Sequence, residues 1–237
     1  LNVELKKELG LKVEPKVAAV CVYYQMIKYA KPSLTESNIN LAAVSTGFPA
    51  GMVPFELKLS EIRSAIEAGA DEIDIVISRE HVLTGNWQEL YNEVKNFKNA
   101  CGSIHLKAIL AVGDLETLRN VAKASWVCMM AGADFIKTST GKESSNASLY
   151  TSLVMCRAIR NYYEQTGVKV GYKPAGGISK AREALQYLIL VKEELGDEWL
   201  KKELFRFGAS SLLGDIERQL DHYISGTYSS FNRHPIV

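Results

Sequence analysis

Short apolar runs rich in β-branched residues recur along the chain, and a segment with helical periodicity follows most of them. Strands of this length that alternate with helices are typical of repeated βα units, in which parallel strands form a sheet covered by helices. The pattern therefore predicts an α/β fold. Its strand candidates are residues 17–23, 40–46, 71–77, 105–111, 134–139, 169–174 and 204–210.

The segments between these runs carry helix start signals and one apolar face. Asn86 together with Glu89 predicts an N-cap pair, and Asp114 predicts the cap of the next helix. In residues 184–195, apolar side chains recur at the spacing of one helical face. Helices of this kind are expected on the outside of a sheet, where they cover it.

The same rhythm sets the expected domain organisation. No linker rich in Pro, Gly or Ser divides the chain, so we expect one domain over residues 1–237. A closed TIM (β/α)8 barrel is the most economical fold for it. A complete barrel has eight strands, whereas the pattern supplies seven candidates, so either one strand lies upstream of Leu1 or the sheet is open.

The charge balance and the sulfur content limit the partners of the chain. Lys and Arg total 28 against 27 Asp and Glu, so no global field attracts nucleic acid or an anionic membrane surface. No apolar stretch is long enough to cross a bilayer. The four cysteines form no CxxC pair, which predicts reduced packing residues in a cytoplasmic protein. The four histidines lack metal-ligand spacing, so we assign no metal.

Lysines lie near the ends of predicted strands, where parallel α/β folds place their reactive groups. Lys137 lies in "DFIKTSTGK", Lys173 begins "KPAGG", and Asp74 lies inside "EIDIVIS". Burial and a neighbouring cation both favour the neutral amine of a lysine, which is its nucleophilic form. Two inward-pointing lysines on adjacent strands would supply both effects. Lys137 is therefore a candidate nucleophile and Lys173 its activator.

These residues also have structural explanations. A single lysine at a strand end can extend its amine to water or pair with a buried acid. Asp74 could simply neutralise Lys107 or Lys173, and such pairing is compatible with a role in proton transfer. Two lysines at strand ends, each followed by a loop of small residues, favour the chemical interpretation.

Loops rich in small residues follow three of the predicted strands. Glycine lets backbone N–H groups approach an anion, and a helix N-terminus adds partial positive charge. Each loop alone is more typical of a turn or a helix cap, but their combined placement indicates a phosphate site. Its candidate residues are Thr140, Gly141, Lys142, Gly176, Gly177, Ser210 and Ser211.

The segments "GADEIDIVI", "ADFIKTSTGK", "GYKPAGGI" and "FGASSLL", in this order, resemble the deoxyribose-phosphate aldolases, a family of class I aldolases on a (β/α)8 barrel. The resemblance runs from about Val17 to Gly226, and "EELGDEWL" is similar to the animal-type branch. It implies reversible cleavage of 2-deoxy-D-ribose 5-phosphate to D-glyceraldehyde 3-phosphate and acetaldehyde, without metal or organic cofactor.

The resemblance also implies a role for each candidate residue. Lys137 would form the Schiff base, Lys173 would favour its neutral form, and Asp74 would shuttle protons with Lys173. The phosphate of the small-molecule phosphosugar substrate would be held by Gly141, Lys142, Gly176, Gly177, Ser210 and Ser211.

The sequence departs from the family at both ends. Family members open their first strand with an Asp-Leu-Thr-Thr-Leu segment that carries another active-site aspartate, and nothing similar occurs between Leu1 and Val17. Since position 1 is also not Met, we expect an N-terminally incomplete barrel whose first strand is missing. Some members end in a tyrosine that enters the site, whereas this chain ends "HPIV", and Tyr228 is a candidate substitute.

Two other functions remain open at this stage. One is a phosphosugar-binding barrel protein without aldolase turnover, and the other is a barrel enzyme that isomerises phosphosugars without covalent catalysis. The sequence also leaves the oligomeric state open, including a homo-oligomer.

Overall fold

The computed structural model describes residues 7, 10 and 16–230, and within them six parallel strands form one sheet. The strands follow one another in chain order, as successive βα units require. The predicted α/β class is confirmed. The strands are β1 (Ala19–Tyr23), β2 (Asn40–Ser45), β3 (Glu72–Val76), β4 (His105–Ile109), β5 (Phe135–Lys137) and β6 (Gly171–Lys173).

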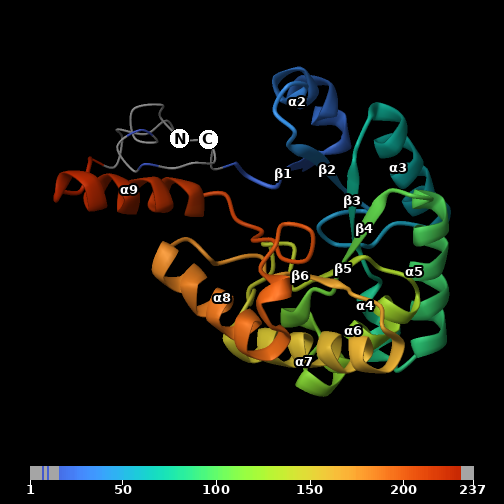
Figure 1. Cartoon of the computed structure of the whole chain (residues 1–237). Coiled ribbons are helices and arrows are strands. Elements are labelled where there is room, and N and C mark those ends of the chain that lie inside the picture. The colour runs from blue at the N-terminus through green and yellow to red at the C-terminus, as the bar shows by residue number, and fades with distance from the viewer. Residues whose placement is uncertain (1–6, 8–9, 11–15, 231–237) are drawn as a thin grey trace.

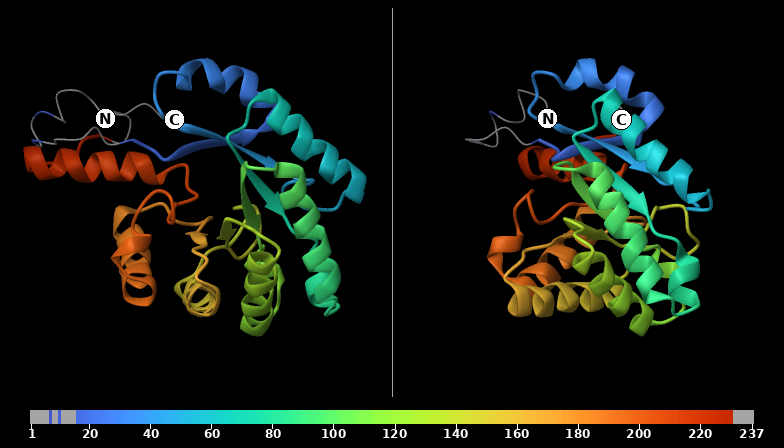
Figure 2. Two further views of the ribbon diagram at one scale, coloured as in Figure 1. Left: turned by 45° about the vertical axis from the view of Figure 1, so that its right-hand side comes forward. Right: turned by 90° about the vertical axis from the view of Figure 1, so that its right-hand side faces the viewer.

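Helices connect the strands and cover the outer face of the sheet. Figure 1 shows α3, α5, α6, α7 and α8 following one another around the outside, and the left view of Figure 2 shows α9 at the open side of this arc. The helices are α2 (Ile27–Leu34), α3 (Phe55–Ala68), α4 (Arg79–Leu83), α5 (Trp87–Cys101), α6 (Leu118–Met130), α7 (Leu149–Thr166), α8 (Ala181–Leu195) and α9 (Leu212–Ser225). Short 3-10 turns are η1 (Tyr24–Met26), η2 (Val112–Asp114) and η3 (Asp197–Trp199).

The seventh predicted strand, residues 204–210, is not a regular strand. It lies parallel to β6 through two isolated bridges, Tyr172 with Phe205 and Ala175 with Gly208. Arg206 N donates to Tyr172 O, and Gly208 N donates to Pro174 O. Pro174 has no N–H to donate in return, so the ladder is interrupted at the position between the two bridges.

The expected first barrel strand concerns the chain ahead of Val17, and residues 1–6, 8–9 and 11–15 lie outside the described part. Among the described residues, β1 pairs only with β2. The hydrogen-bonded sheet is therefore open between β1 and residues 204–210 in the part of the chain that the structure describes.

Side chains alternate between the two faces of the sheet, as the two-residue period of a strand requires. In β3, Ile73 and Ile75 belong to the apolar core shared with the covering helices, which contribute Val94 and Phe97 of α5. Glu72 and Asp74 point to the opposite face, where they contact lysines. Apolar packing thus fixes the outer face and leaves the inner face for charged groups.

Two of the predicted helix starts need correction. Asn86 precedes α5 as predicted, but its side chain makes no capping hydrogen bond. Asp114 lies in η2 and pairs with Arg79 at 3.2 Å, whereas Thr117 caps α6 by accepting from Asn120 N. Glu116 between them has a positive φ of 62°, which a right-handed helix does not accommodate. The helix over residues 184–195 is confirmed as part of α8.

No helix among residues 16–230 is long and apolar enough to cross a membrane.

Gly171 provides a test of the close packing between β5 and β6. A Cβ added there would lie 2.4 Å from two ring carbons of Phe135. We expect Gly171→Ala to lower the free energy of unfolding by about 1–3 kcal/mol, a typical cost of overpacking. The denaturant midpoint measures this change.

Gly214→Ala in α9 is the matched control, because an added Cβ there meets nothing within 4 Å. Helix propensity should leave its midpoint equal or higher. Equal midpoints for the two variants would contradict the packing described here.

Candidate active site

Asp74 is the centre of a buried cluster formed by side chains of four strands. Its Oδ1 accepts a hydrogen bond from Lys107 Nζ at 2.8 Å. Its Oδ2 accepts from Lys137 Nζ at 2.9 Å and from Lys173 Nζ at 2.7 Å. The side chain of Asp74 is fully buried, and those of the three lysines are at most 9% exposed.

The curvature of the sheet creates this cluster. The register aligns Asp74 with Lys107 on β4 and Lys137 with Lys173 on β6. Asp74 and Lys173 lie on strands separated by three strand spacings, about 14 Å in a flat sheet. Their 2.7 Å contact therefore requires the sheet to curl towards a barrel, which brings its strands around one interior.

A second layer of charges lies beside the first on the same face. Glu72 accepts from Lys107 Nζ at 2.6 Å and from Arg206 Nη2 at 3.1 Å. Asn40 Nδ2 also donates to Glu72 at 2.7 Å. Lys107 therefore connects the two carboxylates, and Arg206 ties residues 204–210 to β3 across the sheet interior.

The pKa values of both carboxylates reflect these contacts. Burial alone would raise the pKa of Asp74, but Lys107, Lys137 and Lys173 hold it well below its ordinary value. Burial opposes ionisation of Glu72 too, but the charge of Lys107 and the hydrogen bond from Asn40 outweigh it and lower its pKa to about 2. Both groups are carboxylates at neutral pH.

The cluster contains more basic groups than acidic ones. Three lysines and Arg206 face two carboxylates, Glu72 and Asp74. Lys137 and Lys173 contact the same oxygen, so their nitrogens lie within about 6 Å of each other, a separation at which like charges oppose each other.

The first two predicted phosphate loops follow the ends of β5 and β6, where Lys137 and Lys173 lie. The loop with Gly141 approaches the loop with Gly176, since a Cβ added to Gly141 would lie 3.8 Å from Gly176 Cα. Gly176 N donates to Gly208 O at 3.3 Å, which places the third loop alongside. Gly141, Gly176 and Gly177 all have φ between 81° and 84°, the left-handed region that glycine adopts without strain.

Most residues of the predicted phosphate site are accessible to solvent. Lys142, Gly177, Ser210 and Ser211 are exposed, while Thr140 is half-buried. Ser211 immediately precedes α9 and makes no side-chain capping bond. The backbone N–H groups at the start of α9 therefore face the same loop as Ser210 and Ser211.

A cavity of about 790 Å³ lies between β1 and residues 205–220, and Lys173 lines it. Cys21 lines it as well and is exposed, so its predicted role as a packing residue is wrong. The other three cysteines are buried as predicted. Apolar side chains such as Phe207 and Leu212 form part of its wall.

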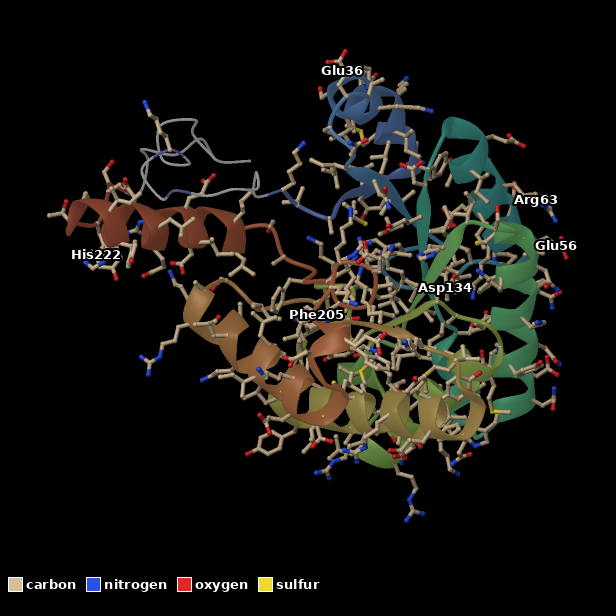
Figure 3. The ribbon with its side chains drawn as sticks, in the orientation of Figure 1. Glu36, Glu56, Arg63, Asp134, Phe205 and His222 are labelled. Carbon is tan, nitrogen blue, oxygen red and sulfur yellow. The ribbon has the colours of Figure 1, made fainter. Side chains whose placement is uncertain are left out.

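Tyr228 does not enter the cluster. Its ring stacks on His222 at 4.1 Å between ring centroids, and its hydroxyl donates to Gln219. Figure 3 shows His222 on the part of α9 that extends away from the sheet. The prediction that Tyr228 replaces the terminal tyrosine of the family is therefore wrong. Residues 231–237, which include "HPIV", lie outside the described part.

Three residues of this region were not identified from the sequence. Glu72 carried a signal, since it occupies the same strand face as Asp74. Arg206 carried none, because only the tertiary fold brings it to Glu72 from 134 positions away. Glu143 also carried none, and its carboxylate accepts hydrogen bonds from Thr140 N and Gly141 N.

A curled parallel sheet with polar side chains gathered at its strand ends, under loops of small residues, is the arrangement of (β/α) barrel enzymes. Comparison with protein families agrees. The model of the DeoC/LacD family aldolases matches residues 3–215, so the chain belongs to this family.

Individual relatives give the same result. Human deoxyribose-phosphate aldolase is 56% identical over 221 residues, which cover 92% of this chain and 70% of the human protein. The solved structure of the aldolase QR15 is 26% identical with a TM-score of 0.69 and covers 94% of this chain and 88% of its own. The tetrameric deoxyribose phosphate aldolase from Aeropyrum pernix has a TM-score of 0.65 at 23% identity and covers 88% and 78%. The barrel fold is thus shown, although the described sheet is open.

Glu72→Gln is expected to destabilise the fold most at neutral pH, and the loss should shrink as the pH falls. A carboxylate whose folded pKa is about 2 and whose ordinary value is 4.5 stabilises the folded state above pH 4.5. That contribution is lost as the pH falls through about 2 and amounts to about 3 kcal/mol. Denaturant unfolding of both proteins over this pH range measures the difference.

The control is Glu164→Gln, which removes an exposed carboxylate on α7. It should follow the wild type at every pH. A difference between wild type and Glu72→Gln that stays constant from neutral pH to about pH 3 would be incompatible with the coupling of Glu72 to Lys107 and Arg206.

Proposed function

We propose that this chain is a Schiff-base aldolase that reversibly cleaves 2-deoxy-D-ribose 5-phosphate to D-glyceraldehyde 3-phosphate and acetaldehyde. The observation that carries the proposal is the shared contact of Lys137 Nζ and Lys173 Nζ with Asp74 Oδ2 in a buried site. Such a pair supplies one amine that can act as a nucleophile beside one ammonium that can donate a proton.

The reaction follows from the chemistry of an amine and a carbonyl. The neutral amine of Lys137 adds to C1 of the open-chain sugar, and loss of water gives an iminium. Loss of that water consumes the proton of the Lys173 ammonium, which leaves Lys173 as a neutral amine. The iminium accepts the electron pair of the C2–C3 bond as the C3 hydroxyl gives its proton to Lys173. D-glyceraldehyde 3-phosphate leaves, and an enamine remains on Lys137. Protonation at C2 and hydrolysis then release acetaldehyde and restore the amine.

We assign the proton for C2 to Lys173. The low pKa of Asp74 makes its carboxylate a poor proton reservoir at neutral pH, because burial is outweighed by the three lysines around it. Asp74 instead holds Lys137 and Lys173 in place and stabilises the ammonium form of whichever keeps its proton. This refines the expected shuttle: the proton moves between substrate and lysine while Asp74 stays charged.

The three loops supply a binding site for the distant phosphate. Backbone N–H groups around Gly141 and Gly177, together with Lys142, Ser210 and Ser211, offer donors and positive charge, and Gly176 lets the first two loops approach each other. A phosphate held there fixes the end of the substrate opposite to C1. Binding energy from a group that does not react can then orient the C2–C3 bond over Lys137.

The similarity to human deoxyribose-phosphate aldolase over 92% of this chain supports this substrate. Binding without turnover and noncovalent isomerisation are the alternatives. Both lack a use for a buried amine beside a second lysine, since neither forms a bond to nitrogen.

We further propose a single catalytic domain that assembles as a homo-oligomer in the cytoplasm. The solved relative from Aeropyrum pernix is described as a tetramer, which supports assembly. The four cysteines are free, as in a reducing compartment.

Borohydride trapping tests the covalent step. Reduction in the presence of acetaldehyde should fix the two-carbon adduct on the Lys137 peptide, and mass spectrometry of the digest locates it. Lys137→Arg should abolish both the adduct and cleavage of the phosphosugar, because a guanidinium forms no iminium under these conditions.

Lys192→Arg is the matched control, since Lys192 is exposed on α8 and pairs with exposed Asp197. This variant should still form the adduct and cleave the phosphosugar. Cleavage that survives in Lys137→Arg would eliminate the Schiff-base mechanism. Phosphosugar binding by the wild type without any adduct would favour the binding protein instead.

A further inference from the structure

The first phosphate loop already binds an anion, and that anion belongs to the chain itself. Thr140 N donates to both carboxylate oxygens of Glu143 at 3.0 Å each. Gly141 N donates to Glu143 Oε2 at 3.2 Å. Two of the N–H groups available to a substrate phosphate are therefore occupied by a carboxylate.

The geometry of the loop is that of an anion site. Thr140, Gly141 and Lys142 present successive backbone N–H groups, and Lys142 N donates to Thr140 Oγ1 at 3.1 Å. Gly141 has a φ of 84°, which turns its N–H towards the same side as that of Thr140. Successive N–H groups arranged in this way form a concave nest that accepts phosphate or carboxylate oxygens alike.

The Glu143 side chain can leave without dismantling the loop. Asn146 Nδ2 donates to the backbone oxygen of Glu143 at 3.1 Å, and this bond does not involve the carboxylate. Glu143 is half-buried and its neighbours Lys142 and Ser144 are exposed. A rotation of the side chain would carry the carboxylate into solvent while the main chain stays in place.

We propose that Glu143 is an internal competitor for the substrate phosphate at the N–H groups of Thr140 and Gly141. The inference rests on the proposed function, because it assigns this loop to phosphate binding. The carboxylate satisfies both donors until a substrate phosphate displaces it.

This competition determines which anions the loop accepts. A ligand binds only if its interactions with the two N–H groups, Lys142 and the adjoining loops exceed those of Glu143. A phosphate dianion has three strong acceptor oxygens and can meet that requirement, whereas an anion with one weak acceptor cannot. Glu143 thus raises the concentration at which any anion fills the loop and favours the phosphorylated sugar over poorer ligands.

Glu143→Gln and Glu143→Ala test the competition. Glu143→Gln removes the charge and keeps the shape, and Glu143→Ala removes the competing oxygens. In both variants the KM for 2-deoxyribose 5-phosphate and the inhibition constant of inorganic phosphate should fall by about three- to tenfold, the worth of one net hydrogen bond. Cleavage of unphosphorylated 2-deoxyribose, which does not use the loop, should keep its kcat/KM.

Glu164→Gln on α7 is the matched control and should leave every constant unchanged. If Glu143 merely orders the loop, both variants will instead show a higher KM for the phosphorylated substrate and weaker inhibition by phosphate, which overturns the proposal. An equal change for the phosphorylated and unphosphorylated sugars also overturns it.

Calorimetric titration with inorganic phosphate separates this inference from the proposed function. The titration requires no turnover, so tighter phosphate binding in Glu143→Gln supports the competition even if the aldolase reaction fails. Unchanged or weaker binding by both variants rejects the competition even if the wild type is an active aldolase.

Discussion

Asp74 Oδ2 lies 2.7 Å from Lys173 Nζ although three strand spacings separate β3 from β6. This contact requires the sheet to curl, and Ile73, Ile75 and the covering helices pack as an apolar layer on the outer face of the curled sheet. Glu72 and Arg206 make a second contact across the same interior. Because the carboxylate oxygens are fully buried, any flattening of the sheet would leave charged groups without partners, at a large cost in free energy.

The same contacts that stabilise the curled sheet prepare its chemistry. Two carboxylates held in their charged form face four basic groups, and Lys137 and Lys173 share one oxygen of Asp74. Asp74 therefore acts as a fixed charge that positions both amines. Glu143 plays a parallel part at the loop, where a carboxylate of the chain satisfies N–H groups that the proposed substrate would use. In both places a charge of the protein occupies the site before substrate arrives.

The sequence was informative wherever a local pattern determines the structure. The apolar run "EIDIV" predicted the strand that carries Asp74, and the strand and helix rhythm predicted the parallel sheet. It was less informative where the outcome depends on distant partners. Nothing near Arg206 indicates Glu72, and the contact of Asp74 with three lysines at once depends on the curvature. Predictions of local detail also failed where a single residue determines the structure. Pro174 interrupts the ladder to residues 204–210, and Thr117 takes the capping role predicted for Asp114.

Lys137 can act as the nucleophile only if part of its population is a neutral amine before substrate binds. NMR of protein labelled with 13C and 15N in its lysines, with the signal assigned through Lys137→Arg, reports whether each Nζ is an amine or an ammonium. The Schiff-base mechanism requires a population of neutral amine at Lys137 at neutral pH, seen as an amine signal that Lys137→Arg loses. A Lys137 signal that is entirely ammonium at neutral pH would contradict this mechanism.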